Sequence, residues 1–176
     1  DVRAGLSDSH DRGRRVLILH FACGTQVVYK PRDVSSDEAF QSLLRWCNAR
    51  SSSLSLATLR VLRRPRYGWI ECAVPLECHD EAMVERYYER AGQLLCIAYA
   101  LGASDLHSEN VMACGEHPVL IDLEMLFVAQ ADPRAQITMP DSVLRTNLLP
   151  FRFKAAQGRA ISDGGFCVLE GSDAAR

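Results

Sequence analysis

Several features that mark other protein classes are missing from this 176-residue sequence. The apolar runs at residues 16–19 and 94–101 are far shorter than the roughly 20 residues that a membrane-spanning helix needs. The 20 basic and 22 acidic side chains nearly balance, to a formal charge of −2, whereas nucleic-acid-binding proteins usually carry a clear basic excess. We therefore expect neither a membrane nor a nucleic acid as a partner.

Paired cysteine spacing is also missing. The seven cysteines are scattered and contain no C-x-x-C pair, which argues against a disulfide framework and against a structural zinc site. Cys72, Cys78 and His79 are near neighbours that offer metal-ligand types, but a fourth ligand is missing and both cysteines lie in apolar surroundings. We expect reduced thiols and, because no signal peptide is visible, a cytoplasmic protein.

The composition is that of a globular protein, with 48% hydrophobic and 24% charged residues. This is enough for one core or for two small lobes. The sequence starts at an aspartate and ends without a terminating pattern, so we expect it to be a piece of a longer protein.

The first part of the chain predicts a polar loop, a β-hairpin and a helix. Residues 1–14 are polar and basic, and the hairpin strands lie at 15–21 and 26–30, where Pro31 ends the second strand. Ser35 or Ser36 caps the helix in a capping box with Glu38, and the apolar spacing continues to residues 48–50.

The rest of the chain adds a second hairpin, a long helix and a third hairpin. The predicted elements are strands at 59–63 and 69–74, a helix at 80–101 ended by Gly102, a polar loop at 103–110, and strands at 111–114 and 119–122 joined by a turn at 115–118. Beyond residue 127 the chain is interrupted by prolines and predicts no element.

This order of elements indicates an α+β fold with the two-lobed layout of a protein-kinase-like fold. We expect an N-lobe-like part at residues 1–76 and the start of a C-lobe-like part at residues 77–176. The order alone is weak evidence, because many α+β domains share it.

Lys30 is the first candidate for chemistry, because it closes a predicted strand. In phosphoryl transfer, a lysine at such a place neutralises phosphate oxygens of ATP, and an acid on the next helix orients it. Glu38 or Asp37 is that acid. The alternative is a surface lysine before a proline, with Glu38 acting only as a capping residue.

The second candidate is the D-x-H-x-x-N spacing in the loop after the long helix. Asp105 is placed to accept a proton from an attacking hydroxyl, His107 to donate a hydrogen bond to a phosphate, and Asn110 to offer a neutral oxygen to Mg²⁺. The alternative is structural, because aspartate and asparagine are common in loops for their turn geometry.

The third candidate is Asp122, at the end of an apolar strand. The predicted hairpin folds it back towards the loop, so Asn110 and Asp122 together offer two of the oxygen ligands that Mg²⁺ prefers. The alternative is an aspartate that is merely exposed at a strand end. In combination, the order of lysine, D-x-H-x-x-N and aspartate favours a kinase-like site.

With this arrangement, residues 7–14 become the phosphate-covering loop. Backbone N–H groups and cations such as Arg14 suit that role, although the G-x-G-x-x-G of ordinary protein kinases is absent. The strand before this loop is then expected to lie outside the chain.

Six blocks of the sequence resemble the dehydratase domain of class II lanthipeptide synthetases, the LanM family. The blocks are SDSHDRGR at 7–14, VYKPR at 28–32, DEAF at 37–40, DLHSEN at 105–110, HPVLIDLE at 117–124 and SVLRTNLLP at 142–150. The resemblance covers about residues 5–155. The catalytic core of that family is similar to lipid kinases, which share the D-x-H-x-x-N order.

The resemblance implies an ATP- and Mg²⁺-dependent enzyme that phosphorylates Ser/Thr of a precursor peptide bearing a leader. The phosphate is then eliminated to leave a dehydroamino acid, and a LanC-like cyclase domain is expected in the full-length chain. The candidate residues are catalytic Asp8, His10, Asp105 and His107, nucleotide-binding Arg14, Lys30 and Glu38, and metal-binding Asn110, Asp122 and Glu124.

Two departures from the family pattern keep other readings open. An arginine and a threonine that the family uses in elimination would fall beyond the last residue, and the zinc-bearing cyclase is absent, so the fragment alone is expected to be incomplete. The alternatives are a kinase-fold phosphotransferase without elimination, and a non-catalytic module that binds the leader peptide or a nucleotide.

Overall fold

The computed structural model describes most of the chain in an α+β arrangement. The described residues are 2–4, 15–51, 53, 55–124, 126, 142–150, 152–155, 158–161 and 164–166. The chain divides into two compact units, one formed by Asp1–Arg90 with Ala113–Val119 and the other by Ala91–Met112 with Leu120–Arg176.

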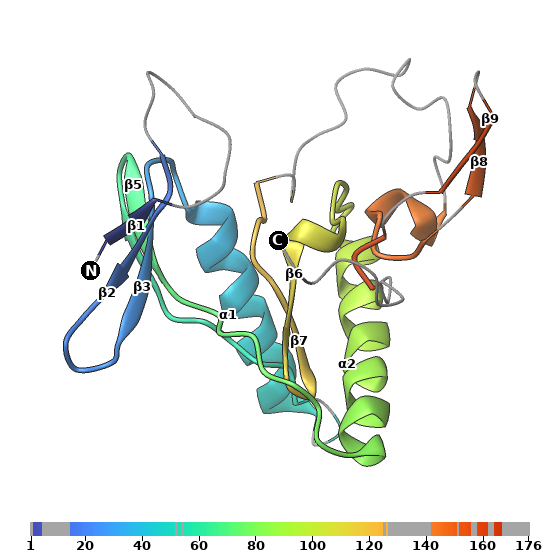
Figure 1. The fold of residues 1–176 in the computed structure, drawn as a ribbon, viewed down its shortest axis with the longest axis horizontal. Helices are drawn as coiled ribbons and strands as arrows, with labels where there is room; N and C mark the ends of the chain where they lie inside the picture. The colour runs from blue at the N-terminus through green and yellow to red at the C-terminus, as the bar shows by residue number, and fades with distance from the viewer. Residues whose placement is uncertain are drawn as a thin grey trace. The chain divides into compact units, whose positions relative to one another are not determined.

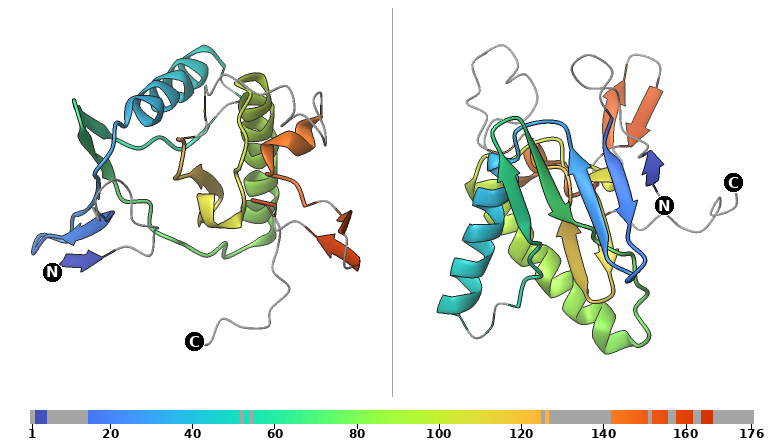
Figure 2. Two further views of the ribbon diagram at one scale, coloured as in Figure 1. Left: turned by 90° about the horizontal axis from the view of Figure 1, so that it is seen from above. Right: turned by 90° about the vertical axis from the view of Figure 1, so that its left-hand side faces the viewer.

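A five-stranded antiparallel sheet dominates the first unit. Its order is β1 (Val2–Ala4), β2 (Leu17–His20), β3 (Gln26–Lys30), β5 (Tyr67–Glu71) and β4 (Val61–Arg64). The right-hand view of Figure 2 shows the blue and green strands side by side. The expectation that the strand before the 7–14 loop lies outside the chain is wrong, because β1 pairs with β2 inside it.

Helix α1 (Ser35–Arg50) follows β3 after a short connection and lies beside the sheet (Figure 1). The predicted capping box does not form. Instead, the Asp33 carboxylate accepts hydrogen bonds from the Ser35 backbone N–H at 3.1 Å and the Ser35 hydroxyl at 3.0 Å. The helix start is therefore capped by an aspartate that precedes it and not by one of its own serines. Acidic side chains in the first turn add a favourable interaction with the helix dipole.

The start of α1 packs directly on the sheet at Gly68, which pairs with Lys30 across β3 and β5. A Cβ atom on Gly68 would clash with both γ-carbons of Val34, and Val34 is completely buried. A glycine is thus required at position 68 because the Val34 side chain lies so close to its backbone. This contact fixes the start of α1 relative to the end of β3.

Helix α2 (Glu81–Ala100) is the long helix that the apolar spacing predicts. The Asp80 side chain accepts a hydrogen bond from the Met83 N–H at 2.7 Å at its start. Gly102 adopts a φ of +69° at its end, and the Ala103 N–H donates to the Ala98 carbonyl at 2.9 Å, which together form a glycine-terminated helix end as predicted.

The β6–β7 hairpin, formed by β6 (Val111–Cys114) and β7 (His117–Leu120), has a turn that is two residues shorter than the sequence suggests. Gly115 has a φ of +60°, so Gly115 and Glu116 make the turn alone. Pro118 is accommodated in a strand of this two-stranded pair. As a consequence Asp122 lies just beyond the end of β7 instead of at its last position.

The second unit continues with elements that the sequence did not predict. They are the 3₁₀ helices η1 (Ser108–Asn110) and η2 (Val143–Thr146) and the hairpin of β8 (Arg152–Ala155) with β9 (Gly158–Ile161). Asn147 ends η2 with a φ of +60°, a conformation that asparagine tolerates better than most residues.

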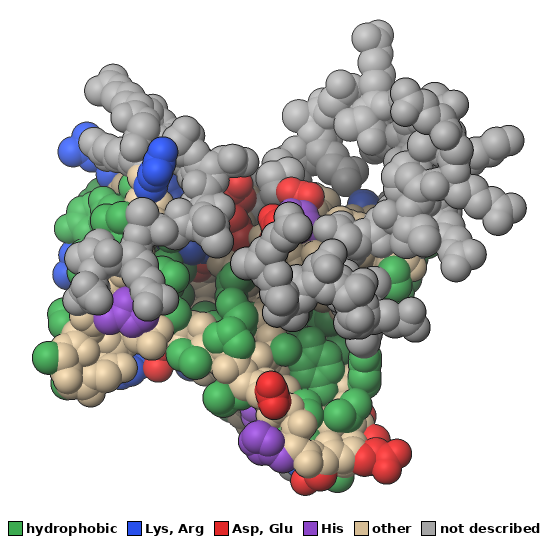
Figure 3. Space-filling model, in the orientation of Figure 1, with side chains coloured by type: hydrophobic (Ala, Val, Ile, Leu, Met, Phe, Trp, Pro, Cys, Tyr) green, Lys and Arg blue, Asp and Glu red, His purple; other side chains and the backbone are tan. Residues whose placement is uncertain are grey.

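The buried apolar side chains lie on α1, α2, β5 and β7 and in the segments that connect the elements. In the first unit they are Val34, Phe40, Leu44, Leu56, Ile70 and Val119, and in the second Ala91, Leu94, Ala98, Ala103, Leu106, Leu120, Leu123, Leu126 and Leu148. Apolar side chains also lie on the surface, as Figure 3 shows for one face. Within the described residues, no helix has the length and hydropathy that crossing a bilayer requires.

Candidate functional site

Lys30 lies at the end of β3 and is bound by an acid from the first turn of α1. Its Nζ is 3.2 Å from Asp37 Oδ1, and the two residues are only 7% and 3% exposed. The guanidinium of Arg32 reaches Asp37 Oδ2, also at 3.2 Å. A buried carboxylate with two cationic partners holds the lysine ammonium at a fixed place.

Of the two acids that the sequence leaves open, Asp37 is therefore the one that pairs with Lys30. Glu38 lies on another side of α1, with its carboxylate 3.9 Å from Arg63 and 46% of its side chain exposed. Successive helical residues point about 100° apart. Only one of them can face the end of β3.

The D-x-H-x-x-N loop has an internal hydrogen-bond network. Asp105 has a φ of +61°, which is unusual for a residue other than glycine. The residue is exposed. The Asn110 side-chain N–H donates to the Asp105 backbone carbonyl at 2.8 Å. His107 precedes η1, and its Nδ1 accepts from the Glu109 N–H at 3.4 Å, near the outer limit for a hydrogen bond.

A later segment fixes this loop from outside. The Leu106 N–H donates to the Thr146 carbonyl at 3.0 Å, and His107 forms a β-bridge with Gly164. Thr146 is completely buried; its hydroxyl donates to the Val143 carbonyl at 2.7 Å and accepts from the Leu148 N–H at 3.2 Å. A Cβ on Gly165 would stand 2.5 Å from the Leu106 carbonyl oxygen, so the two backbones touch.

Thr146 and Gly165 are the site residues that the sequence reasoning missed. They occupy a region without periodicity, and nothing in their spacing connects them to the loop at 105–110. The one available signal was the SVLRTNLLP block that contains Thr146.

Asn110 and Asp122 are connected through the backbone. The Ile121 N–H donates to the Asn110 carbonyl at 3.0 Å, which places the residue before Asp122 against Asn110. Because the Asn110 amide nitrogen is the donor to Asp105, its Oδ1 is the atom available to a cation. Asp122 is half-buried, whereas Glu124 is exposed.

An ionic network at the turn of the β6–β7 hairpin fixes it to the first half of α2. Glu116 accepts from Arg86 Nε at 2.6 Å and lies 2.9 Å from Arg90 Nη2, while Arg90 also donates to the backbone carbonyls of Glu116 and Ser55. The hydrogen bond from Arg86, with the charge of Arg90, lowers the pKa of Glu116 below its usual value. The pKa of the adjacent His117 is lowered, mainly by burial and to a smaller extent by the positive charge of Arg90.

Three predicted site residues, Asp8, His10 and Arg14, lie outside the described residues. Six cysteines are free in the part of the chain that the structure describes, and Cys167 lies outside it. The same part contains no group of three or more His, Cys, Asp or Glu side chains that could hold a metal ion.

Comparison with known proteins gives two matches. Residues 1–175 match a family described as "Domain of unknown function (DUF4135)". The chain is also 34% identical over 113 residues to "Lacticin 481/lactococcin biosynthesis protein LcnDR2" of Lactococcus lactis subsp. lactis, an alignment that covers 58% of this chain and 12% of that protein. The chain thus spans a small part of this relative.

Proposed function

The chain belongs to the DUF4135 family, found in LanM-type lanthipeptide synthetases, and we propose that it provides the ATP-handling core of such an enzyme. The proposed reaction is ATP- and Mg²⁺-dependent phosphorylation of Ser/Thr in a ribosomal precursor peptide, followed by elimination of the phosphate. The relative is named a lacticin 481/lactococcin biosynthesis protein, which supports a peptide-modifying role.

A kinase-like role for Lys30 rests on its burial and its partner. A lysine ammonium that is paired to an acid on the following helix is the arrangement by which kinases place a cation on ATP phosphates. The Lys30–Asp37 pair, at 3.2 Å, supports this assignment. Asp37 acts here as the residue that orients the lysine, and the two-lobed kinase-like core belongs to the same proposal.

Asp105 is proposed to activate the Ser/Thr hydroxyl of the peptide. Its carboxylate accepts the hydroxyl proton as the oxygen attacks the transferred phosphoryl group. The observation that carries the proposal is the fixed loop. Asn110 is tied to the Asp105 carbonyl at 2.8 Å, and Thr146 is tied to the Leu106 N–H at 3.0 Å, so the exposed acid extends from an ordered backbone.

Asn110 and Asp122 fit the donor chemistry that Mg²⁺ requires. One offers a neutral amide oxygen and the other a carboxylate, and hard cations with oxygen ligands accept both. When bound, Mg²⁺ supplies positive charge to the phosphate oxygens. Glu124 is a further proposed ligand, two residues beyond Asp122.

In the elimination step, a base removes the α-proton of the phosphorylated residue. The electrons of that C–H bond form the C=C bond, and the C–O bond to phosphate breaks, so inorganic phosphate leaves and a dehydroamino acid remains. His107, Asp8 and His10 are proposed for the phosphorylation or the elimination step from their family motif positions. Cations such as Arg14 and Lys30 are proposed to lie opposite the charge of the leaving phosphate.

Mass analysis of a precursor peptide incubated with the protein, ATP and Mg²⁺ tests the proposal. Transfer adds about 80 Da per site and completed elimination removes about 18 Da, masses that follow from the two chemistries. Phosphorylation without water loss indicates a phosphotransferase that does not eliminate. A peptide mass that is unchanged, with ATP binding that needs neither Mg²⁺ nor Asp122, contradicts the proposal and indicates a binding module.

A further inference from the structure

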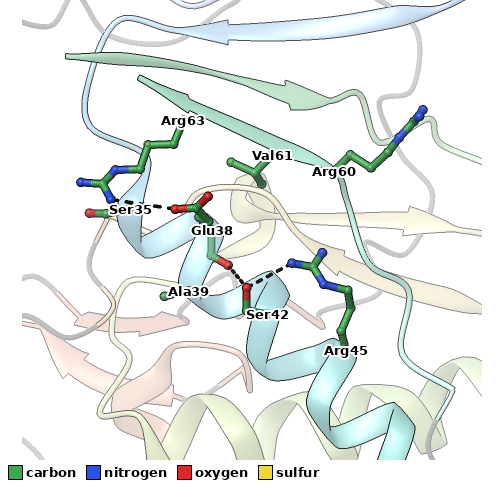
Figure 4. A pocket seen from close by; sticks show the side chains of 8 residues that line it. All are labelled: Ser35, Glu38, Ala39, Ser42, Arg45, Arg60, Val61 and Arg63. Carbon is green, nitrogen blue, oxygen red and sulfur yellow. Dashed lines mark hydrogen bonds and ion pairs between the residues drawn. The ribbon is translucent and has the colours of Figure 1, made fainter. Parts of the chain in front are cut away.

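A hollow of about 560 Å³ lies between the outer face of α1 and strand β4. Its lining comes from Ser35, Glu38, Ala39, Ser42, Arg45, Arg60, Val61 and Arg63. Both elements belong to the first unit. The helix residues are spaced three and four apart, so they form one face of α1, opposite the strand residues in Figure 4.

This hollow does not have the character of a small-molecule pocket. Its lining contains only two apolar residues, Ala39 and Val61, whereas cofactor and substrate pockets are enclosed and mostly apolar. It contains instead three guanidinium groups and one carboxylate. The charge of the lining therefore favours an anionic ligand.

The three arginines keep hydrogen-bonding capacity for such a ligand. Arg45 donates to the Ser42 hydroxyl at 3.1 Å, and no ion pair to Arg45 occurs among the described residues. Arg60, whose side chain is 85% exposed, pairs with Glu71, and Arg63, 46% exposed, pairs with Asp33. Exposed pairs of this kind contribute little, and each guanidinium has five donors, so an incoming carboxylate can be bound alongside them.

The position of strand β4 in the sheet indicates how an extended ligand would be oriented. It is at the edge of the sheet, with β5 on one side and no further described strand on the other. Just before β4, the Gln41 side chain of α1 accepts the Leu59 N–H at 2.8 Å, which fixes the chain entering β4 to the helix. An edge strand beside side-chain pockets is a common place for an extended peptide to bind.

We propose that the hollow between α1 and β4 docks an acidic, extended segment of the peptide substrate. Carboxylates of that segment bind Arg45, Arg60 and Arg63, while its backbone runs along the edge of β4. That the segment comes from the substrate rests on the proposed function. The recognition of carboxylates rests only on the arginines and the edge strand.

Fluorescence anisotropy with two labelled peptides tests this docking. The probes are a short peptide of alternating glutamate and valine, and the same peptide with lysine in place of glutamate. The glutamate peptide is expected to bind, with an affinity that falls as salt is added. Arg45→Gln and Arg60→Gln should each weaken it about tenfold, the effect of losing one hydrogen bond to a charged group.

Arg66→Gln is the matched control, because Arg66 is exposed at the β4–β5 turn but does not line the hollow. Equal binding of the lysine peptide, equal loss in the control, or displacement by an equimolar amount of inorganic phosphate or ATP overturns the proposal. Thermal melting of each variant shows that the fold is intact.

The outcome is separable from that of the proposed function. Asp105→Asn should keep peptide binding and lose phosphoryl transfer. If wild-type protein binds the glutamate peptide but never modifies a precursor, the docking stands and the proposed reaction fails. If Arg45→Gln modifies the precursor with an unchanged KM, the docking fails and the reaction stands.

Discussion

The side-chain amide of Asn110 donates to the backbone carbonyl of Asp105 at 2.8 Å, so two residues of the D-x-H-x-x-N spacing are bound to each other. This bond spans a loop in which Asp105 has a φ of +61°. The left-handed backbone conformation costs a residue other than glycine roughly 1–2 kcal/mol of free energy. It persists where the surrounding structure fixes it. The loop therefore has one backbone shape that presents the Asp105 carboxylate.

Replacing Asp105 with asparagine should remove activity without removing the fold. Asparagine tolerates the left-handed conformation but accepts no proton from a hydroxyl, so transfer from ATP to a precursor peptide should fall by about 10²–10⁴-fold. Radiolabel transfer measures the activity, and circular dichroism gives the melting temperature. Dehydration at the wild-type rate by this variant would exclude Asp105 from the chemistry.

Asp37→Asn should destabilise the protein, because it removes the buried carboxylate that lies 3.2 Å from the ammonium of Lys30. Breaking a buried pair costs about 3 kcal/mol or more, which urea unfolding can measure. Glu38→Gln, one position along the same helical turn, is the control. Glu38 is about half exposed and should change the free energy of unfolding by less than about 0.5 kcal/mol. Similar effects from the two variants would refute the assignment of Asp37.

Gly68→Ala should be destabilising because the added methyl group meets the γ-carbons of buried Val34. Overpacking of this kind costs about 1–3 kcal/mol. Val34→Ala creates a gap at the same contact, so the double variant should be more stable than the sum of the two losses predicts. Strictly additive unfolding free energies would show that the two residues do not compete for the same space.

Thr146→Val should weaken the loop that carries Asp105. Valine keeps the volume but loses the hydroxyl that donates to Val143 and accepts from Leu148, at a cost of about 1–3 kcal/mol. Thr146→Ser retains both hydrogen bonds and should lose less. Hydrogen exchange of the Leu106 amide is the readout, with faster exchange expected in the valine variant only.

The stability of the protein should fall in acid in two steps. The pKa of His117 is lowered from its usual 6.5, so its contribution is complete above that value and is lost as pH falls through the lower folded value. The pKa of Glu116 is lowered from 4.5, so the second loss begins below 4.5 as its carboxylate is protonated beside Arg86 and Arg90.

Urea unfolding of the wild type and of His117→Gln from about pH 7.5 to about pH 5 isolates the first step. The glutamine variant does not titrate in this range. The wild type should therefore lose stability relative to the variant as pH falls below 6.5. A constant difference between the two proteins would show that protonation of His117 costs nothing in the folded state.

The sequence predicted those parts of the fold that depend on local spacing. Helices α1 and α2 and strand β3 lie where the apolar spacing, Gly102 and Pro31 place them, because each is decided by neighbours within one or two turns. The turn of the β6–β7 hairpin is two residues shorter than predicted, because β7 begins at His117. Pro118 suggested a turn, but it is tolerated in a two-stranded pair where its missing N–H faces no third strand among the described residues.

Parts of the site that depend on distant segments were not predictable. Asp37 and Glu38 are both acidic and both lie in the first turn of α1, and nothing in their spacing distinguishes the one that pairs with Lys30. The contact of Thr146 with Leu106 joins residues far apart in the chain, with no pattern in the intervening sequence. Roles for Asp8, His10 and Arg14 stay predictions.

The distance in sequence between the loop at residues 103–110 and its partners at Thr146 and Gly165 has a kinetic consequence. Helix α2 and the β6–β7 hairpin contain mostly local contacts and can form early, whereas the bonds of Leu106 and His107 must wait for a loop closure that costs chain entropy. During synthesis, Thr146 and Gly165 also leave the ribosome after the loop at residues 103–110. The backbone that presents Asp105 is therefore expected to be among the final parts of this chain to reach its native shape.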